Sequence, residues 1–306
     1  MASSTSPLAL SISGLCKRYG KHQVLTDLAL TVERGSIQGL VGLNGSGKTT
    51  TLECVLGLRD YDSGDVRVLE HSPARLYSAR GRIVAIFDTP SLNPNLTVRQ
   101  CLQQAALLLD KPARELSEVE ALLGVQQYSN FRIKQLSLGN KRRASIAQAL
   151  LADPELVLLD EPFNGLDAGG VDDILQLIST LNAESGTTFM LSSHQLPYLE
   201  KICSHIAILH EGAIAANGTI DELLDDRKVI KLLSPDMHGA KALLAEMQGV
   251  RIIAEDDGYL SLECPDLSSA ELNAELVKQA IPVAELIREK ASLETLFRKI
   301  TGASQA

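Results

Sequence analysis

The sequence predicts an α/β fold with a mainly parallel sheet, a helical insert and a small α+β domain at the end of the chain. Apolar strands of the kind buried in parallel sheets alternate with helical segments over the first two-thirds of the chain. Apolar residues recur at helical spacing between residues 92 and 151, so we expect the insert there. The last part changes to the order β-α-β-β-α-β, which is typical of a ferredoxin-like unit.

Length and charge limit the classes of protein to which the chain can belong. Its 306 residues exceed one average domain, and 29 Lys and Arg against 38 Asp and Glu give a net charge of −9. This acidic balance argues against a nucleic acid as partner. No apolar stretch reaches the roughly 18 residues of a membrane-spanning helix, and we find no secretory signal. Five cysteines without a C-x-x-C pair indicate reduced thiols in a cytoplasmic protein.

The first domain, residues 1–228, is expected to begin with strands and to return to strands after the insert. Turn sequences such as Asp62-Ser63-Gly64 separate the early strands. After the insert, two buried strands flank a helix, and a hairpin follows. The expected strands are 8–13, 24–32, 37–42, 66–69, 156–160, 188–192, 206–210 and 213–215, and the helix is 171–181.

A charged run at residues 221–228 separates an accessory domain, residues 229–306. Its expected strands are 229–233, 251–255, 259–264 and 282–287, and its expected helices are 238–247, 268–279 and 293–300. The sequence leaves two roles open for this domain. It is either an appendage that aids dimerisation or a ligand sensor.

A glycine-rich loop at residues 42–49 is the strongest functional signal. It matches G-x-x-x-x-G-K-[ST], follows the apolar strand SIQGLV and opens the helix-compatible run TTTLECVLGL. Such a loop turns backbone N–H groups around phosphates. Lys48 is expected to reach the β- and γ-phosphates, and the Thr49 hydroxyl is expected to bind Mg²⁺. The residues expected to bind ATP here are Gly42, Leu43, Asn44, Gly45, Ser46, Gly47, Lys48, Thr49 and Thr50.

A second loop, Leu136-Ser137-Leu138-Gly139-Asn140, runs into an apolar helix. Ser137 is a good N-cap, and Gly139 lets an anion approach the first turn. Here the chain resembles the ATP-binding cassette (ABC) family, whose Leu-Ser-x-Gly signature contacts the ATP held by the opposite subunit. The resemblance implies a RecA-like P-loop cassette with a helical subdomain, ATP and Mg²⁺ as ligands, a second cassette, and Ser137 and Gly139 as ATP contacts. The three cations at residues 141–143 are either solvated or close to a phosphate, and we leave them unassigned.

Two acids end the apolar strand at residues 156–160. A buried strand ending in carboxylates places them at the edge of the sheet, where ligands of open α/β folds bind. Asp160 is therefore expected to hold Mg²⁺, and Glu161 is expected to orient and polarise the attacking water. Together with Lys48 and His194, Glu161 forms the catalytic group that the sequence predicts.

Four further residues follow from the resemblance alone. His194 stands at the end of a strand, where the family places its switch histidine near the γ-phosphate. Tyr19 matches the aromatic residue that stacks on adenine. Asn164 and Asp167 lie in a segment similar to the D-loop, which couples the two sites across the dimer.

Asp88 departs from the family pattern. Cassettes usually carry Gln at the end of the strand that leads into the insert, and aligning Pro90 and Leu96-Thr97-Val98 puts Asp88 there. This shorter, charged side chain would bind Mg²⁺ only if the loop moves inward or a water bridges; otherwise it is a tolerated substitution. The segment IFDTPSLNPNLT is similar to the loop of bacitracin and lantibiotic-resistance exporters, which suggests export of a drug or an antimicrobial peptide.

The resemblance implies the ATP-hydrolysing subunit of an ABC exporter. Two cassettes, expected to be identical, would close on ATP and drive a separate transmembrane permease from the cytoplasmic face of the membrane. Two alternatives stay open: a soluble ABC ATPase without a permease, and a regulatory cassette that binds ATP without hydrolysing it. The first is disfavoured because the chain has one cassette and no long coiled coil. An ATPase assay separates the second.

Overall fold

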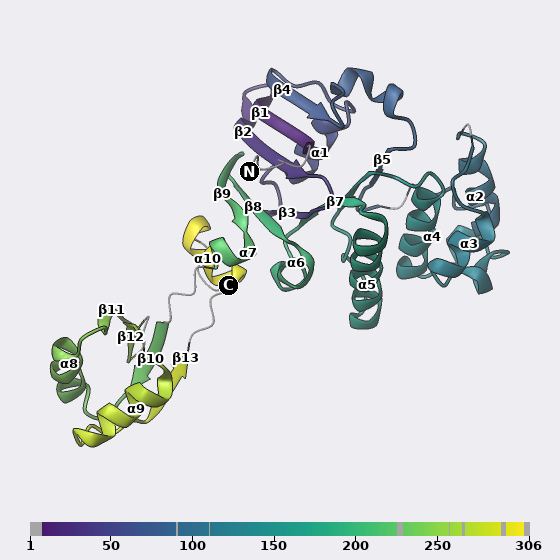
Figure 1. Cartoon of the computed structure of the whole chain (residues 1–306). Coiled ribbons are helices and arrows are strands. Elements are labelled where there is room, and N and C mark those ends of the chain that lie inside the picture. Colours follow the sequence, from purple (N-terminus) through teal and green to yellow (C-terminus); the bar gives the residue numbers. More distant parts are fainter. Residues whose placement is uncertain are drawn as a thin grey trace, which may run out of the picture. The chain divides into compact units, whose positions relative to one another are not determined.

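The computed structural model describes residues 8–89, 91–109, 111–224, 229–256, 258–264, 267–288 and 292–302. They divide into two compact units (Figure 1). The first runs to Leu223 and also includes residues 300–302, and the second is Leu224–Lys299. Our expected boundary, after residue 228, ends a segment, 225–228, that lies outside the described residues.

The first unit contains the parallel sheet that the sequence predicts. The strand order is β5-β6-β7-β3-β8-β9, and every neighbouring pair is parallel except β8 and β9, which form an antiparallel hairpin. All residues of β3, β6 and β7 are buried, as expected for strands covered on both faces. The bounds are Ile37–Val41 (β3), Ile83–Ile86 (β5), Leu156–Asp160 (β6), Thr188–Ser193 (β7), His205–His210 (β8) and Ala213–Thr219 (β9).

The ends of three central strands meet at one edge of this sheet. Val41 of β3 pairs with Ser193 of β7, and Asp160 of β6 pairs with Ser192 of β7. The residues that follow each strand therefore lie side by side. They are the glycine-rich loop after β3, Glu161 after β6 and His194 after β7.

A second, antiparallel sheet of three strands has the order β2-β1-β4. Its strands are β1 (Leu8–Tyr19), β2 (His22–Glu33) and β4 (Ser63–Val68). The first strand is longer than predicted, because register shifts let it bend and continue past Gly14. Gly64 allows the strands to approach there, since a Cβ on it would lie 2.7 Å from the Gly14 carbonyl oxygen. The fourth strand ends before Leu69, whose φ is +45°.

Helices fill the expected insert and flank the sheet. Within the insert, α2, α3 and α4 group beside β5 (Figure 1). Thr97 and Gln100 form a capping box on α2, and the Ser137 side chain caps α4 by accepting from the Asn140 N–H. The bounds are Lys48–Val55 (α1), Val98–Ala106 (α2), Leu116–Leu122 (α3), Leu138–Leu150 (α4), Ala168–Ser185 (α5), Leu196–Ile202 (α6) and Ile220–Leu223 (α7), with short 3₁₀ turns at Pro73–Ala79, Gln126–Tyr128 and Ile133–Gln135. None of the helices described here is long and apolar enough to cross a membrane.

The second unit has the predicted element order, β-α-β-β-α-β. Its sheet order is β11-β12-β10-β13, and all neighbours are antiparallel. Apolar residues from its strands and helices, such as Leu232, Leu262 and Leu272, form a core of their own. The assignment to the ferredoxin-like fold stays a prediction. The bounds are Val229–Leu233 (β10), Met237–Glu246 (α8), Arg251–Asp256 (β11), Tyr259–Glu263 (β12), Ser269–Lys278 (α9) and Glu285–Arg288 (β13), with Leu293–Thr301 (α10) after them.

An ion-pair group holds the start of β6. The Glu155 carboxylate accepts from Arg82, which precedes β5, and from Arg34, which follows β2. The hydrogen bond from Arg82, aided by Arg34, lowers the pKa of Glu155 below its ordinary value of 4.5. Water still reaches this carboxylate, which is 39% exposed, so we expect the group to contribute only about 1 kcal/mol to stability.

The lowered pKa of Glu155 predicts how this contribution depends on pH. A carboxyl group whose pKa is lower in the folded state stabilises the fold fully above about pH 5, and its contribution disappears as the pH falls through the folded-state value. Glu155→Gln should therefore unfold at lower urea concentration than the wild type at pH 7, and the two should converge as the pH falls through the lowered pKa of Glu155. If the difference in urea midpoint between the two proteins stayed the same from pH 7 into acid, the stabilising role of ionised Glu155 would be wrong.

Candidate ATP and magnesium site

The glycine-rich loop between β3 and α1 is shaped by glycines that have no room for a side chain. Gly47 has φ +109°, and a Cβ on it would lie 2.7 Å from Leu25 Cδ2. A Cβ on Gly42 would lie 2.7 Å from the Leu209 carbonyl oxygen. No side chain caps the first turn of α1, and the buried Ser46 hydroxyl has no hydrogen-bond partner among the described residues. The loop therefore offers unpaired N–H and O–H groups, which fit a phosphate chain.

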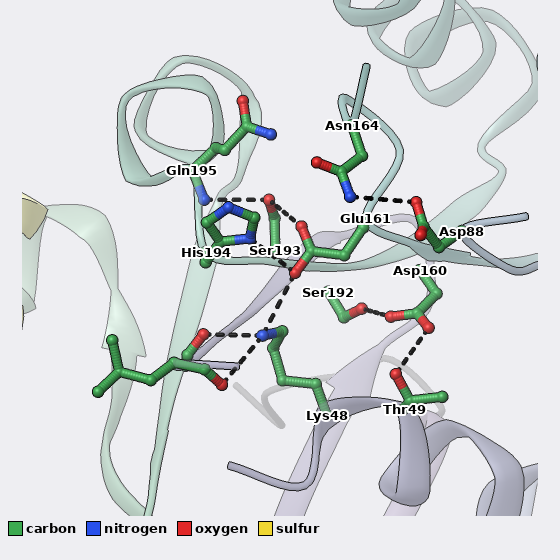
Figure 2. A network of polar contacts seen from close by, with 12 residues as sticks. Lys48, Thr49, Asp88, Asp160, Glu161, Asn164, Ser192, Ser193, His194 and Gln195 are labelled. Carbon is green, nitrogen blue, oxygen red and sulfur yellow. Dashed lines mark hydrogen bonds and ion pairs between the residues drawn. The ribbon is translucent and has the colours of Figure 1, made fainter. Parts of the chain in front are cut away.

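Lys48 is the buried cation of this loop. Its Nζ donates to the Gly42 carbonyl at 2.8 Å and to the Leu43 carbonyl at 3.3 Å, and it lies 3.3 Å from Glu161 Oε1 (Figure 2). The residue is only 6% exposed. The charge of Lys48 thus lies within the phosphate loop and beside the carboxylate of Glu161, the residue that follows β6.

Two oxygen-bearing side chains that could bind a hard cation, Thr49 and Asp160, lie next to each other. The Thr49 hydroxyl donates to Asp160 Oδ2 at 2.8 Å, and the Ser192 hydroxyl donates to Asp160 Oδ1 (Figure 2). The described residues contain no group of three His, Cys, Asp or Glu side chains that would hold a metal by themselves. This donor set fits Mg²⁺, which proteins commonly bind through one or two carboxylates together with waters and phosphate oxygens.

Glu161 is held in place by three side chains. Its carboxylate contacts His194 Nδ1 at 2.9 Å, accepts from the Ser193 hydroxyl at 3.0 Å and faces the Lys48 ammonium (Figure 2). Burial acts to raise the pKa of Glu161, but the His194 hydrogen bond and the Lys48 charge outweigh it, so the pKa lies below its ordinary value. Glu161 is therefore ionised at neutral pH, as a proton acceptor must be.

These side chains share one cavity of about 630 Å³. It is lined by the predicted residues Asn44, Gly45, Gly47, Lys48, Thr49, Thr50, Asp88, Asp160, Glu161, Asn164 and His194, and by Val24. Asn164 Nδ2 donates to Asp88 Oδ1 at 3.3 Å, so the D-loop segment touches the residue that replaces the usual Gln. The functional roles assigned to these residues stay predictions.

Seven predicted site residues lie outside this lining: Gly42, Leu43 and Ser46 belong to the glycine-rich loop itself, and Tyr19, Ser137, Gly139 and Asp167 come from other segments. Tyr19 is 41% exposed, and the Lys17 ammonium lies 5.1 Å from its ring centroid. Ser137 caps α4 with its side chain, and Gly139 follows it in the first turn. Asp167 caps α5 by accepting from the Gly170 N–H at 2.8 Å, which gives it a structural task in this chain.

The structure adds one residue that we left unassigned. Arg142 is 1% exposed and donates to the carbonyl oxygens of Phe87, Asp88 and Glu161. Burial lowers its pKa, and the nearby carboxylates of Asp88 and Asp160 oppose that shift. Of the two interpretations left open, a side chain solvated on an exposed helix face is wrong for Arg142.

The helical periodicity of the sequence could have predicted that Arg142 is buried. The residues three, four and seven positions later on α4 are Ser145, Ile146 and Ala149, and all three are buried. Arg142 shares their face. Arg143, one position on, instead contacts Asp173 and the Leu123 carbonyl.

Comparison with known proteins agrees with this geometry. A family model described as ABC transporter matches residues 25–164. The bacitracin transport ATP-binding protein BcrA of Bacillus licheniformis is 32% identical over 96% of this chain and 97% of its own. The Nod factor export ATP-binding protein I of Ralstonia nicotianae is 30% identical over 96% of this chain and 94% of its own. A solved ATP-binding subunit of an ABC transporter superposes with a TM-score of 0.66 at 30% identity, covering 71% of this chain and 92% of that one.

The parallel core with its phosphate loop and the helical insert with its signature loop together define a nucleotide-hydrolysing cassette. This chain belongs to the ABC transporter family. It is an ATPase that uses ATP with Mg²⁺, and the predicted fold class is confirmed for its first unit.

The position of Asp88 predicts an effect on magnesium dependence. Its carboxylate lines the cavity next to Asp160, and its side chain is 49% exposed. If Asp88 contacts Mg²⁺ directly or through a water, Asp88→Gln should still hydrolyse ATP but change the Mg²⁺ concentration at half-maximal rate by about tenfold. Titrating Mg²⁺ at fixed ATP measures this. Superimposable titrations of the two proteins would dispose of the metal contact.

Proposed function

We propose that this chain is the ATP-hydrolysing subunit of an ABC exporter that acts with a separate membrane permease. The observation that supports this best is the convergence of Lys48, Thr49, Asp160, Glu161 and His194 on one cavity. Relatives named for bacitracin transport and Nod factor export match along nearly the whole chain. The relatives' names favour transport over a soluble cassette, and the complete hydrolytic site favours an active ATPase over a regulatory cassette.

Each side chain has a distinct task in this proposal. The Lys48 ammonium would neutralise charge on the β- and γ-phosphates, and Thr49 with Asp160 would hold Mg²⁺. When bound, Mg²⁺ offsets the negative charge that the phosphoryl group carries during transfer. Glu161 accepts a proton from the attacking water, and His194 fixes the position of the Glu161 carboxylate through its Nδ1.

A second cassette, expected to be an identical copy, would complete each site. Ser137 and Gly139 stand at the start of α4 and do not line the cavity of their own chain. The exposed side chains of Leu43 and Leu138 lie within the two phosphate-binding segments. These features support closure of two chains around ATP, with each signature loop facing the partner's phosphate loop.

The membrane partner and the place of action follow from the relatives. We propose that the chain binds its permease at the cytoplasmic face of the membrane and that the exported compound is a drug or an antimicrobial peptide. The accessory domain that we expect at residues 229–306, most of which lies in the unit Leu224–Lys299, would aid dimerisation. A ligand-sensing role is the alternative.

Affinity purification of the tagged full-length chain from detergent-solubilised membranes of its native host tests this proposal. We expect a polytopic membrane protein to co-purify and the complex to hydrolyse ATP. Co-sedimentation with ribosomes or DNA, without any membrane protein, would contradict it. Absence of ATPase activity in an intact complex would favour a regulatory cassette.

A further inference from the structure

Arg142 is a buried charge that lies behind the ATP cavity without lining it. It belongs to α4, in the turn after the N-cap Ser137. Its Nη1 donates to the Phe87 carbonyl at 2.9 Å, and its Nη2 donates to the Asp88 carbonyl at 2.8 Å and the Glu161 carbonyl at 3.2 Å. Nη2 also lies 3.5 Å from Asp88 Oδ1. A rigid, planar guanidinium holds such a set of acceptors in one geometry.

The three acceptors come from the ends of two adjacent strands. The ladder between β5 and β6 ends at the pair Ile86 and Leu159, and Phe87, Asp88 and Glu161 follow it. Arg142 therefore joins the segment after β5 and the segment after β6 to the signature helix.

The backbone of Glu161 needs such support. Its φ of +46° is left-handed, a backbone conformation that is strained for a residue other than glycine. Its N–H donates to the Ser192 carbonyl at 2.8 Å, and its carbonyl accepts from the Asn164 N–H at 3.2 Å as well as from Arg142. These bonds hold the peptide groups on both sides of the Glu161 Cα and so aim its carboxylate into the cavity.

We propose that Arg142 is a positioning residue for ATP hydrolysis, which ties the place of Glu161 and Asp88 to the place of α4. The inference rests on the proposed role of Glu161 as the proton acceptor. Because α4 begins with the signature loop, a movement of that loop reaches Glu161 through a single buried side chain. Arg142 contacts neither the phosphate loop nor Lys48, so its loss should slow the chemical step without weakening ATP binding.

The test compares Arg142→Gln and Arg142→Lys with the wild type, using the purified full-length chain. We expect kcat to fall by about 10- to 100-fold, as a small misplacement of a reacting group does. KM for ATP, and the affinity for a fluorescent non-hydrolysable ATP analogue, should stay within about threefold. Arg143→Gln is the matched control, because Arg143 contacts Asp173 and Leu123 instead. It should keep both kcat and KM.

Unchanged kcat in the Arg142 variants would overturn the proposal, and so would a raised KM with kcat intact. If thermal melts show that these variants do not fold, Asp88→Asn decides, because it removes the charge that pairs with Arg142. It is measured at saturating Mg²⁺, since Asp88 also lines the cavity and accepts from Asn164. It should lower kcat by about three- to tenfold at unchanged KM, and an unchanged kcat again overturns the proposal. A Glu161→Gln variant with normal turnover would instead refute the proposed role of Glu161, so the two failures are distinguishable.

Discussion

Glu161→Gln should lower the steady-state rate of ATP hydrolysis by about 10²- to 10⁴-fold, the range expected for a positioned general base. Glutamine has the size of glutamate and can still meet Ser193 and His194, so the cavity should keep its shape. Its amide oxygen is far too weak a base to take the proton of the attacking water. ATP binding should therefore survive while turnover does not.

The chain offers a matched control at the other end of the same strand. Glu155 comes directly before β6, and Glu161 comes directly after it. Glu155 pairs with Arg82 and Arg34, away from the cavity. Glu155→Gln changes charge and size in the same way, yet it should keep kcat at saturating ATP. Phosphate release assays on both variants make the comparison. Normal turnover by Glu161→Gln would refute the assignment of Glu161.

Lys48→Met should weaken ATP binding by about 100-fold or more. A hydrogen bond to a charged group contributes about 1.5–3 kcal/mol, and 1.4 kcal/mol is a factor of ten in affinity. Lys48 is expected to contact two phosphates, so removing its ammonium should lower the affinity for ATP by at least two factors of ten. Methionine fills a similar volume in this buried position, which limits secondary effects on packing.

The matched control for Lys48→Met is Lys201→Met, on α6 and exposed. It removes one positive charge outside the cavity, so the affinity for ATP should not change. Titration with a fluorescent ATP analogue measures both variants. Thermal melts separate the binding effect from the cost of leaving Glu161 without its cation. If Lys48→Met binds the analogue as the wild type does, the phosphate contact is wrong.

Much of the cassette was predictable, because its signals are local. The G-x-x-x-x-G-K-[ST] loop carries its own geometry, and the buried strand ending in Asp160 and Glu161 places both acids at the sheet edge. The β-α-β-β-α-β order of the second unit followed from apolar spacing in the same way. Periods of 2 and 3.6 residues depend on neighbours in the sequence, so they are visible without a structure.

The features that we missed depend on contacts between distant residues. Arg142 donates to the backbone after two strands that are distant in the sequence. Phe87 and Asp88 lie more than fifty positions before it, and Glu161 lies nearly twenty positions after it. The continuation of β1 to Tyr19 depends on its pairing with β2 and β4. The coupling role of Asp167 stays a prediction, but its contact as the N-cap of α5 was missed, because only the helix start at Ala168 reveals it. Side-chain partners of this kind are set by the fold and not by local pattern.

The most direct test of the whole account is the mass of Glu161→Gln in solution, measured by light scattering with and without ATP and Mg²⁺. An ATPase cassette that closes on ATP as a pair should show one chain without nucleotide and two chains with it, because the variant binds ATP but does not hydrolyse it. Lys48→Met under the same conditions should stay a single chain. A single chain for Glu161→Gln at saturating ATP and Mg²⁺ would contradict ATP-driven closure of two cassettes.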